Sequence, residues 1–126
     1  MLILRGNILE ENLIYKKSYD FAVEVFRVLH SYLNVSDNGV EFVSLVKSCA
    51  NIALNIKEAV YEESPEDFIA KMKLALKNAR ETEYWIDLLT ESRSIYEEEE
   101  WKPAINEIIE TLETIVENAE KIEITI

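Results

Sequence analysis

The chemistry that this chain could perform is limited by its single histidine and its single cysteine. Nucleophilic catalysis by a Ser-His-Asp or Cys-His pair would have to use His30. A ferritin-like di-iron site needs paired Glu-x-x-His motifs, and no glutamate stands three residues before His30. His30 lies at the edge of one apolar helical face, and Cys49 lies in the middle of another. We therefore interpret His30 as a packed, hydrogen-bonded histidine and Cys49 as a small buried hydrophobic residue.

Acidic residues gather at two places, Glu62, Glu63, Glu66 and Asp67 around a turn and the run 97–100. All-α nucleotide pyrophosphohydrolases hold magnesium between Glu-x-x-Glu motifs on facing helices, because a hard cation needs converging oxygens. Glu63-x-x-Glu66 has this spacing but spans a proline-containing loop, so its side chains need not converge. We interpret both clusters as helix caps and solvated charge. We therefore predict no catalytic residue, no metal ligand and no cofactor, with a magnesium-dependent nucleotide pyrophosphohydrolase as the alternative to a non-enzymatic protein.

Three basic residues, Lys73, Lys77 and Arg80, fall within about 60° of arc on one predicted helix. This basic stripe could contact nucleic acid, or it could be a solvated face paired in part with Glu81 and Glu83. The net charge of −12 argues against direct nucleic-acid binding, because the affinity comes largely from counterions that Lys and Arg displace. The same negative charge disfavours binding to a membrane surface.

Four amphipathic patterns carry these residues, and we predict helices at about 12–33, 40–61, 65–91 and 100–121. Only two glycines and two prolines occur in 126 residues, too few turn signals for a sandwich or a barrel. Ser64 followed by Pro65 is typical of a helix N-terminus. Short loops make consecutive helices antiparallel, so we predict an all-α, up-down four-helix bundle, a single domain over residues 1–126. The ends, 1–10 and 122–126, are predicted as an arm or a tail, or as a paired ribbon.

The first predicted helix is apolar over more of its circumference than a single bundle needs. Its charged residues fall within about 100° of arc, and the remaining arc is almost wholly apolar, about twice the width of a surface-helix stripe. One flank should therefore face something beyond its own bundle, and self-association is the simplest explanation. We predict an oligomer interface formed by Tyr15, Tyr19, Val23 and Phe26.

The N-terminal residues 1–4 are too short for a signal-peptide core, and no apolar run approaches the roughly 18 residues needed to span a bilayer. A single cysteine leaves no partner for an intramolecular disulfide and fits a reducing compartment. We predict a soluble, cytoplasmic protein.

Three segments resemble one known family. Residues 51–59, NIALNIKEA, resemble the Ser-Ile-x-x-Asn-Ile-Ala-Glu-Gly signature of the four-helix-bundle proteins encoded in 23S rRNA intervening sequences. Residues 68–81, FIAKMKLALKNARE, resemble that family's Phe-x-x-Phe-Leu-x-x-Ala-x-Gly-Ser-x-x-Glu segment, and residues 19–22, YDFA, its Tyr-Asp-Leu-Ala pattern. The resemblance covers roughly residues 12–90. Asn51, Lys57 and Ala59 stand where the signature has Ser, Ala and Gly.

This family also includes the accessory variability determinants of diversity-generating retroelements, and the resemblance implies a non-enzymatic bundle that assembles into a ring of five. Basic members are thought to bind nucleic acid and a reverse transcriptase, so we expect a protein or an RNA–protein partner here. Asn55, Glu58 and Glu81 match family positions, and Asn51 occupies the position of the signature Ser. We interpret them first as a polar network that ties the second and third helices together, and second as a binding site.

Overall fold

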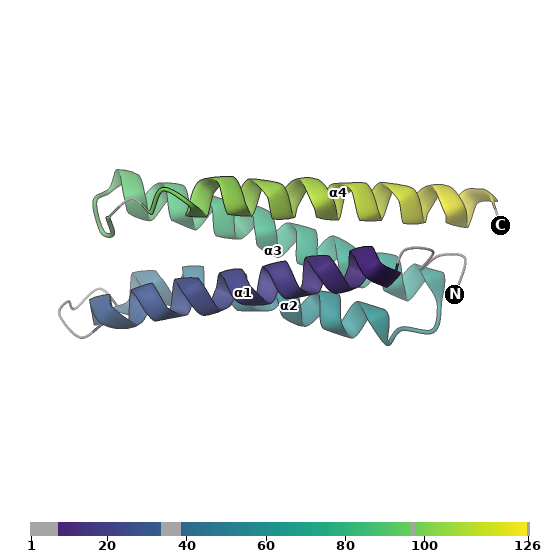
Figure 1. Ribbon diagram of the computed structural model, residues 1–126, viewed down its shortest axis with the longest axis horizontal. Helices are drawn as coiled ribbons and strands as arrows, with labels where there is room; N and C mark the ends of the chain where they lie inside the picture. The colour runs from purple at the N-terminus through teal and green to yellow at the C-terminus, as the bar shows by residue number, and fades with distance from the viewer. Residues whose placement is uncertain (1–7, 34–38, 97, 126) are drawn as a thin grey trace.

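The computed structural model describes residues 8–33, 39–96 and 98–125, and within these ranges the chain forms four helices and no strand. They are α1 (Ile8–Leu33), α2 (Gly39–Val60), α3 (Pro65–Glu91) and α4 (Trp101–Thr125). Each helix packs against the next one in sequence, and α4 also contacts α1. Figure 1 shows the four helices running along the long axis in alternating directions. The predicted all-α, up-down four-helix bundle is confirmed.

The helix boundaries agree with the prediction except at the two ends of the chain. Residues 8–10, predicted as part of an arm, belong to α1, and residues 1–7 lie outside the described residues. Residues 122–125 are the last turn of α4, so the predicted tail or ribbon is wrong there. Ile115, Ala119 and Ile122 continue the helical spacing of the core face, and this outweighs the short alternation of polar and apolar residues at the end.

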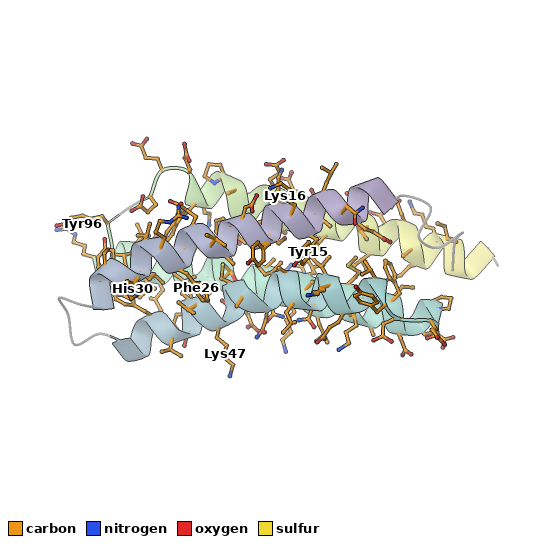
Figure 2. All side chains as sticks on the ribbon, turned by 60° about the horizontal axis from the view of Figure 1, so that its bottom comes forward. Tyr15, Lys16, Phe26, His30, Lys47 and Tyr96 are labelled. Carbon is orange, nitrogen blue, oxygen red and sulfur yellow. The ribbon has the colours of Figure 1, made fainter. Side chains whose placement is uncertain are left out.

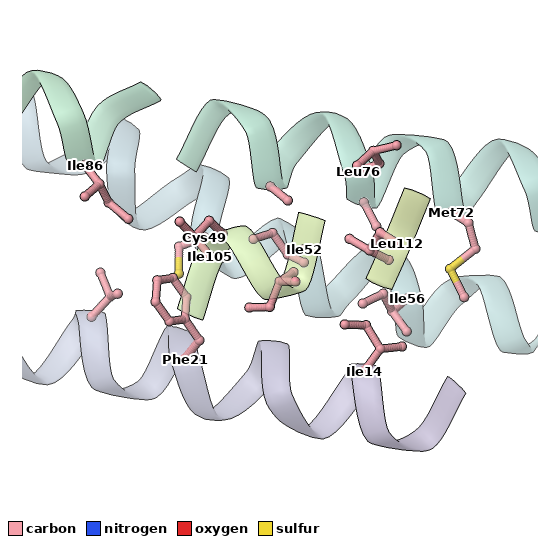
Figure 3. Close-up of a cluster of buried hydrophobic side chains, with 14 of the residues drawn as sticks. Ile14, Phe21, Cys49, Ile52, Ile56, Met72, Leu76, Ile86, Ile105 and Leu112 are labelled. Carbon is pink, nitrogen blue, oxygen red and sulfur yellow. The ribbon is translucent and has the colours of Figure 1, made fainter. Parts of the chain in front are cut away.

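One continuous core runs along the bundle axis and takes side chains from all four helices (Figure 3). In Figure 3, Ile14 and Phe21 of α1 and Ile52 of α2 face side chains of α3 and α4. The largest side chains that are almost fully buried are Phe42, Phe68, Ile14, Leu29, Leu45, Ile52, Ile56, Met72, Ile105, Ile108, Leu112 and Val25. No helix in the described ranges is both long and apolar enough to cross a bilayer.

The start of α3 is fixed by its capping residues. The Ser64 hydroxyl accepts a hydrogen bond from the backbone N–H of Asp67 at 3.1 Å, and Pro65 occupies the first helical turn. Glu66 and Asp67 place negative charge beside the positive end of the helix dipole. The predicted start of this helix is confirmed.

We expect Ser64→Ala to lower the free energy of unfolding by about 1 kcal/mol, because the N–H of Asp67 would lose its acceptor. Urea unfolding followed by circular dichroism measures this difference. Ser31→Ala serves as a control, since the exposed Ser31 hydroxyl only donates to the Val28 carbonyl within its own helix. Equal losses in the two variants would contradict the capping role.

Candidate functional site

The outer flank of α1 carries large apolar side chains that the other three helices leave uncovered. Tyr19 is 53% exposed, Phe26 44% and Val23 38%. Tyr15 is half-buried, and its ring stacks on that of Tyr19 with centroids 6.0 Å apart. The core-facing residues of the same helix, such as Val25 at 0%, are buried. The four predicted interface residues therefore lie together on a surface that a single chain does not bury.

This uncovered surface lies on the side of α1 that is next to α2. Tyr15 lines a small open cleft together with Ile56 and Val60 of α2 and with Tyr61, which follows that helix. Figure 2 shows the Tyr15 and Phe26 side chains in the space between α1 and α2 on the viewer's side. We call Tyr15, Tyr19, Val23 and Phe26, with their neighbours on α2, the α1–α2 apolar face.

Helix α2 adds exposed apolar residues that the sequence analysis did not assign. Val43 is 58% exposed and Leu54 49%, and their separation of eleven positions, about three helical turns, puts them on the same side of the helix. Lys47 lies between them along this outer ridge and points away from the bundle in Figure 2. The ridge separates the α1–α2 apolar face from a polar groove on the other side of α2. A helical-wheel projection of α2 alone shows these additional apolar residues, but only the fold shows that they lie beside α1.

The four residues at family-motif positions, Asn51, Asn55, Glu58 and Glu81, do not form one network. The Asn55 amide donates to the backbone carbonyl of Asn51 at 3.0 Å, a contact within α2. Glu58 forms an ion pair with Lys71 of α3 at 2.9 Å. The hydrogen bond and the charge of Glu58 raise the pKa of Lys71. Glu81 is exposed and makes no hydrogen bond or ion pair with the described residues. Of the four, only Glu58 links the second and third helices, so the predicted network is wrong as a single unit.

A buried pair of hydroxyls, which sequence reasoning missed, provides a second polar link between α2 and α3. Thr82 Oγ1 lies 3.0 Å from Ser48 Oγ and 2.8 Å from the backbone carbonyl of Asn78. The Ser48 hydroxyl in turn donates to the Leu45 carbonyl at 3.1 Å. Both residues are buried. A polar side of α2 is indicated by residues that recur at three- and four-residue spacing, Ser44, Ser48, Asn51 and Asn55. No local signal identifies Thr82 as the partner of Ser48.

We expect Thr82→Val to destabilise the bundle by about 1 kcal/mol, because it removes a buried hydroxyl and its two contacts while keeping the side-chain shape. Thr114→Val is a matched control: the Thr114 hydroxyl donates to the Glu110 carbonyl four residues earlier at 3.0 Å, but Thr114 is exposed. Thermal and urea unfolding compare the two variants. A loss for Thr114→Val as large as that for Thr82→Val would contradict a link between the helices.

Ser48 of this hydroxyl pair also lines an open polar groove of about 380 Å³ between α2 and α3. We call it the α2–α3 groove. One wall comes from α2 and the other from α3, with Trp85 on the α3 wall. Its lining residues are Ser44, Lys47, Ser48, Asn51, Leu74, Lys77, Asn78, Glu81 and Trp85.

Two residues of the predicted basic stripe, Lys73 and Arg80, lie on the flank of α3 that meets α4, and the third, Lys77, also lines the α2–α3 groove. Lys73 forms an ion pair with Glu120 at 3.0 Å, and Arg80 with Glu113 at 2.9 Å. The partners are therefore carboxylates of α4, and the predicted pairing with Glu81 and Glu83 is wrong, since Glu83 pairs with Lys102 at 3.3 Å. Two of the three cations of the stripe are already neutralised within the chain.

The remaining residues considered for catalysis do not converge. Glu63 and Glu66 are exposed, and the described residues contain no group of three His, Cys, Asp or Glu side chains that could hold a metal ion. This arrangement gives no support to the hydrolase alternative. His30 is exposed, so its prediction as a packed histidine is wrong. Cys49 is fully buried as predicted, and burial raises the pKa of its thiol to about 12.

A crystal structure from Bacteroides thetaiotaomicron VPI-5482, described as a protein with unknown function from the S23 ribosomal protein family, is 36% identical to this chain. It superposes with a TM-score of 0.76, over 82% of this chain and 97% of that one. Among curated proteins, none matches this chain. The family model of the 23S rRNA-intervening sequence protein matches residues 10–117, and the chain therefore belongs to that family.

Proposed function

We propose that this protein is a non-enzymatic scaffold whose copies assemble into a ring through the α1–α2 apolar face, and that the ring binds a protein or an RNA–protein partner. One observation carries the proposal: Tyr19, Val23 and Phe26 stand 38–53% exposed on one flank of α1. Side chains of this size rarely gather on the surface of a monomer without a binding role. Aromatic residues are also enriched at the centres of protein interfaces.

Copies of the chain form a ring if this face meets a different surface of the neighbouring copy. The face is a flank of two neighbouring helices, and a second copy can cover it with a different surface of its own. Such a head-to-tail contact repeats around the assembly until the rotation closes. The number of five subunits comes from the family resemblance.

The net charge favours a partner with a basic protein surface. Each subunit contributes a charge of −12, so an assembly of several copies repels a bare phosphate backbone over most of its surface. A basic protein, alone or in complex with RNA, meets no such repulsion.

Size-exclusion chromatography with light scattering tests the assembly directly. We expect a mass of about five times the 14.6 kDa of one chain, and no turnover of nucleotides with magnesium. The ultraviolet absorbance ratio of the same peak reports whether nucleic acid co-purifies. A mass of 14.6 kDa at micromolar concentration would contradict the proposal.

A further inference from the structure

We propose that the α2–α3 groove is a binding site for a nucleotide unit, with its phosphate held by Lys47 and Lys77 and its base against Trp85. The ligand can be a free mononucleotide or one unit of a single-stranded RNA, and both offer the same phosphate, sugar and base. The groove is formed within a single chain, so this site does not depend on the proposed ring.

The first argument is the charge of the groove in an acidic protein. Of the Lys and Arg side chains that the structure describes, eight form an ion pair with another described residue. The four that do not are Lys47, Lys57, Lys77 and Arg93. Lys47 and Lys77 line the same groove from opposite walls. Uncompensated lysines on facing walls leave positive charge available to an anion.

The second argument is the set of neutral polar groups between the lysines. Ser44, Asn51 and Asn78 are half-buried groove residues, and the Asn78 amide donates to the Leu74 carbonyl at 2.9 Å. The second N–H of that amide and the Asn51 side chain remain available to a ligand. Hydroxyl and amide groups of this kind can fix the orientation of a phosphate or a base edge.

Glu81 and Trp85 decide which anion fits. Glu81 is the one carboxylate that lines this groove, and it disfavours a ligand that is anionic throughout, such as inorganic phosphate or an acidic peptide. A nucleotide carries hydroxyl and amino donors beside its phosphate, and these can donate to Glu81. Trp85 is half-buried, and Tyr84 packs against it edge-on with ring centroids 5.3 Å apart. An indole held in this way gives a base a flat surface to stack on.

The same contacts argue against the basic stripe as the phosphate site. Lys73 and Arg80 would have to leave Glu120 and Glu113 before they could bind a phosphate, whereas Lys47 has no such partner among the described residues. Lys77 belongs to both surfaces. Lys47 and Lys73 therefore separate the two possibilities, because each lies on only one of them.

Titration of the ¹⁵N-labelled full chain with AMP and with UMP, followed by NMR, tests the site. We expect the Trp85 indole N–H signal to shift while that of the buried Trp101 stays in place. Lys47→Gln should weaken nucleotide binding about tenfold, because it removes one charge-assisted hydrogen bond. Lys73→Gln removes the same charge from α3 and should change the affinity less than twofold.

Three results would overturn the proposal. They are no shift of the Trp85 signal at millimolar nucleotide, an equal loss of affinity in Lys47→Gln and Lys73→Gln, and inorganic phosphate binding as tightly as AMP. An oligouridine that binds more tightly than UMP, with the same dependence on Lys47, would support the site and identify single-stranded RNA as the source of the nucleotide. Because these readouts do not involve the mass of the assembly, they can fail while the ring stands, and the ring can fail while they hold.

Discussion

Phe26→Glu is expected to dissociate the proposed ring into subunits of 14.6 kDa without unfolding them. Phe26 is 44% exposed in the single chain, so a carboxylate at this position remains hydrated when the chain is alone. In an assembled interface the same carboxylate would lose its water without gaining a partner, which costs several kcal/mol. Truncation of a central aromatic residue alone weakens an interface about 30-fold or more. Light scattering measures the mass, and circular dichroism confirms that the helices remain.

Leu88→Glu provides a matched control for this prediction. Leu88 is 42% exposed, nearly the same as Phe26, but it lies on α3, away from the α1–α2 apolar face. The control should keep the mass of the wild-type assembly. Dissociation in both variants would mean either that Leu88 lies in the surface that covers this face or that any added carboxylate disrupts the assembly. An intact assembly in Phe26→Glu would place the interface elsewhere.

Local signals were enough to predict the order and type of the helices. Ser64 and Pro65 form a short-range start signal, and the structure places α3 where that signal predicts. The core face of α4 repeats at helical spacing, and Ile105, Ile108 and Leu112 are fully buried as that spacing requires. These features depend on residues a few positions apart, so a single sequence contains them.

Contacts between distant helices could not be predicted in the same way. The ion pairs Lys73–Glu120 and Arg80–Glu113 join residues more than thirty positions apart, and their pairing depends on how α3 and α4 pack. A helical wheel shows which side of one helix is polar, but not which neighbour covers that side. Ser18 is a polar residue that the bundle buries. Its hydroxyl has no hydrogen-bond partner among the described residues, so its polar character did not indicate an exposed position.

The same distinction between local and long-range signals applies to the two candidate sites. The apolar excess of α1 was visible in the sequence, and the structure leaves Tyr19 and Phe26 exposed as that excess predicts. The α2–α3 groove was not predicted, because its lysines lie thirty residues apart on different helices. Lys77 was noticed for its spacing from Lys73, although the groove places it across from Lys47. Spacing along one helix identified the stripe that Lys77 shares with Lys73 and Arg80, but not the groove that Lys77 also lines.

Alkylation of Cys49 is expected to be at least a thousandfold slower in the folded protein than in the unfolded chain. The reactive species is the thiolate, and burial raises the pKa of Cys49 from 9.0 to about 12, so at pH 9.0 about one folded molecule in a thousand carries it. The side chain is also fully buried, which excludes the reagent. Mass spectrometry after iodoacetamide treatment with and without urea measures the ratio. Because the chain has one cysteine, every added group reports on Cys49.

The same burial gives the stability a pH dependence of known sign. Between pH 9.0 and about 12 the folded chain keeps the thiol proton and the unfolded chain loses it. The free energy of unfolding therefore falls as pH rises through this range, by up to about 1.4 kcal/mol per pH unit, whereas below pH 9.0 the thiol contributes no slope. Urea unfolding of the wild type and of Cys49→Ala isolates this slope, because the two chains differ only at this residue. Curves that remain parallel across this range would mean that the thiol is ionised as easily in the bundle as in water, and a core that admits water at Cys49 could not be the packed core described here.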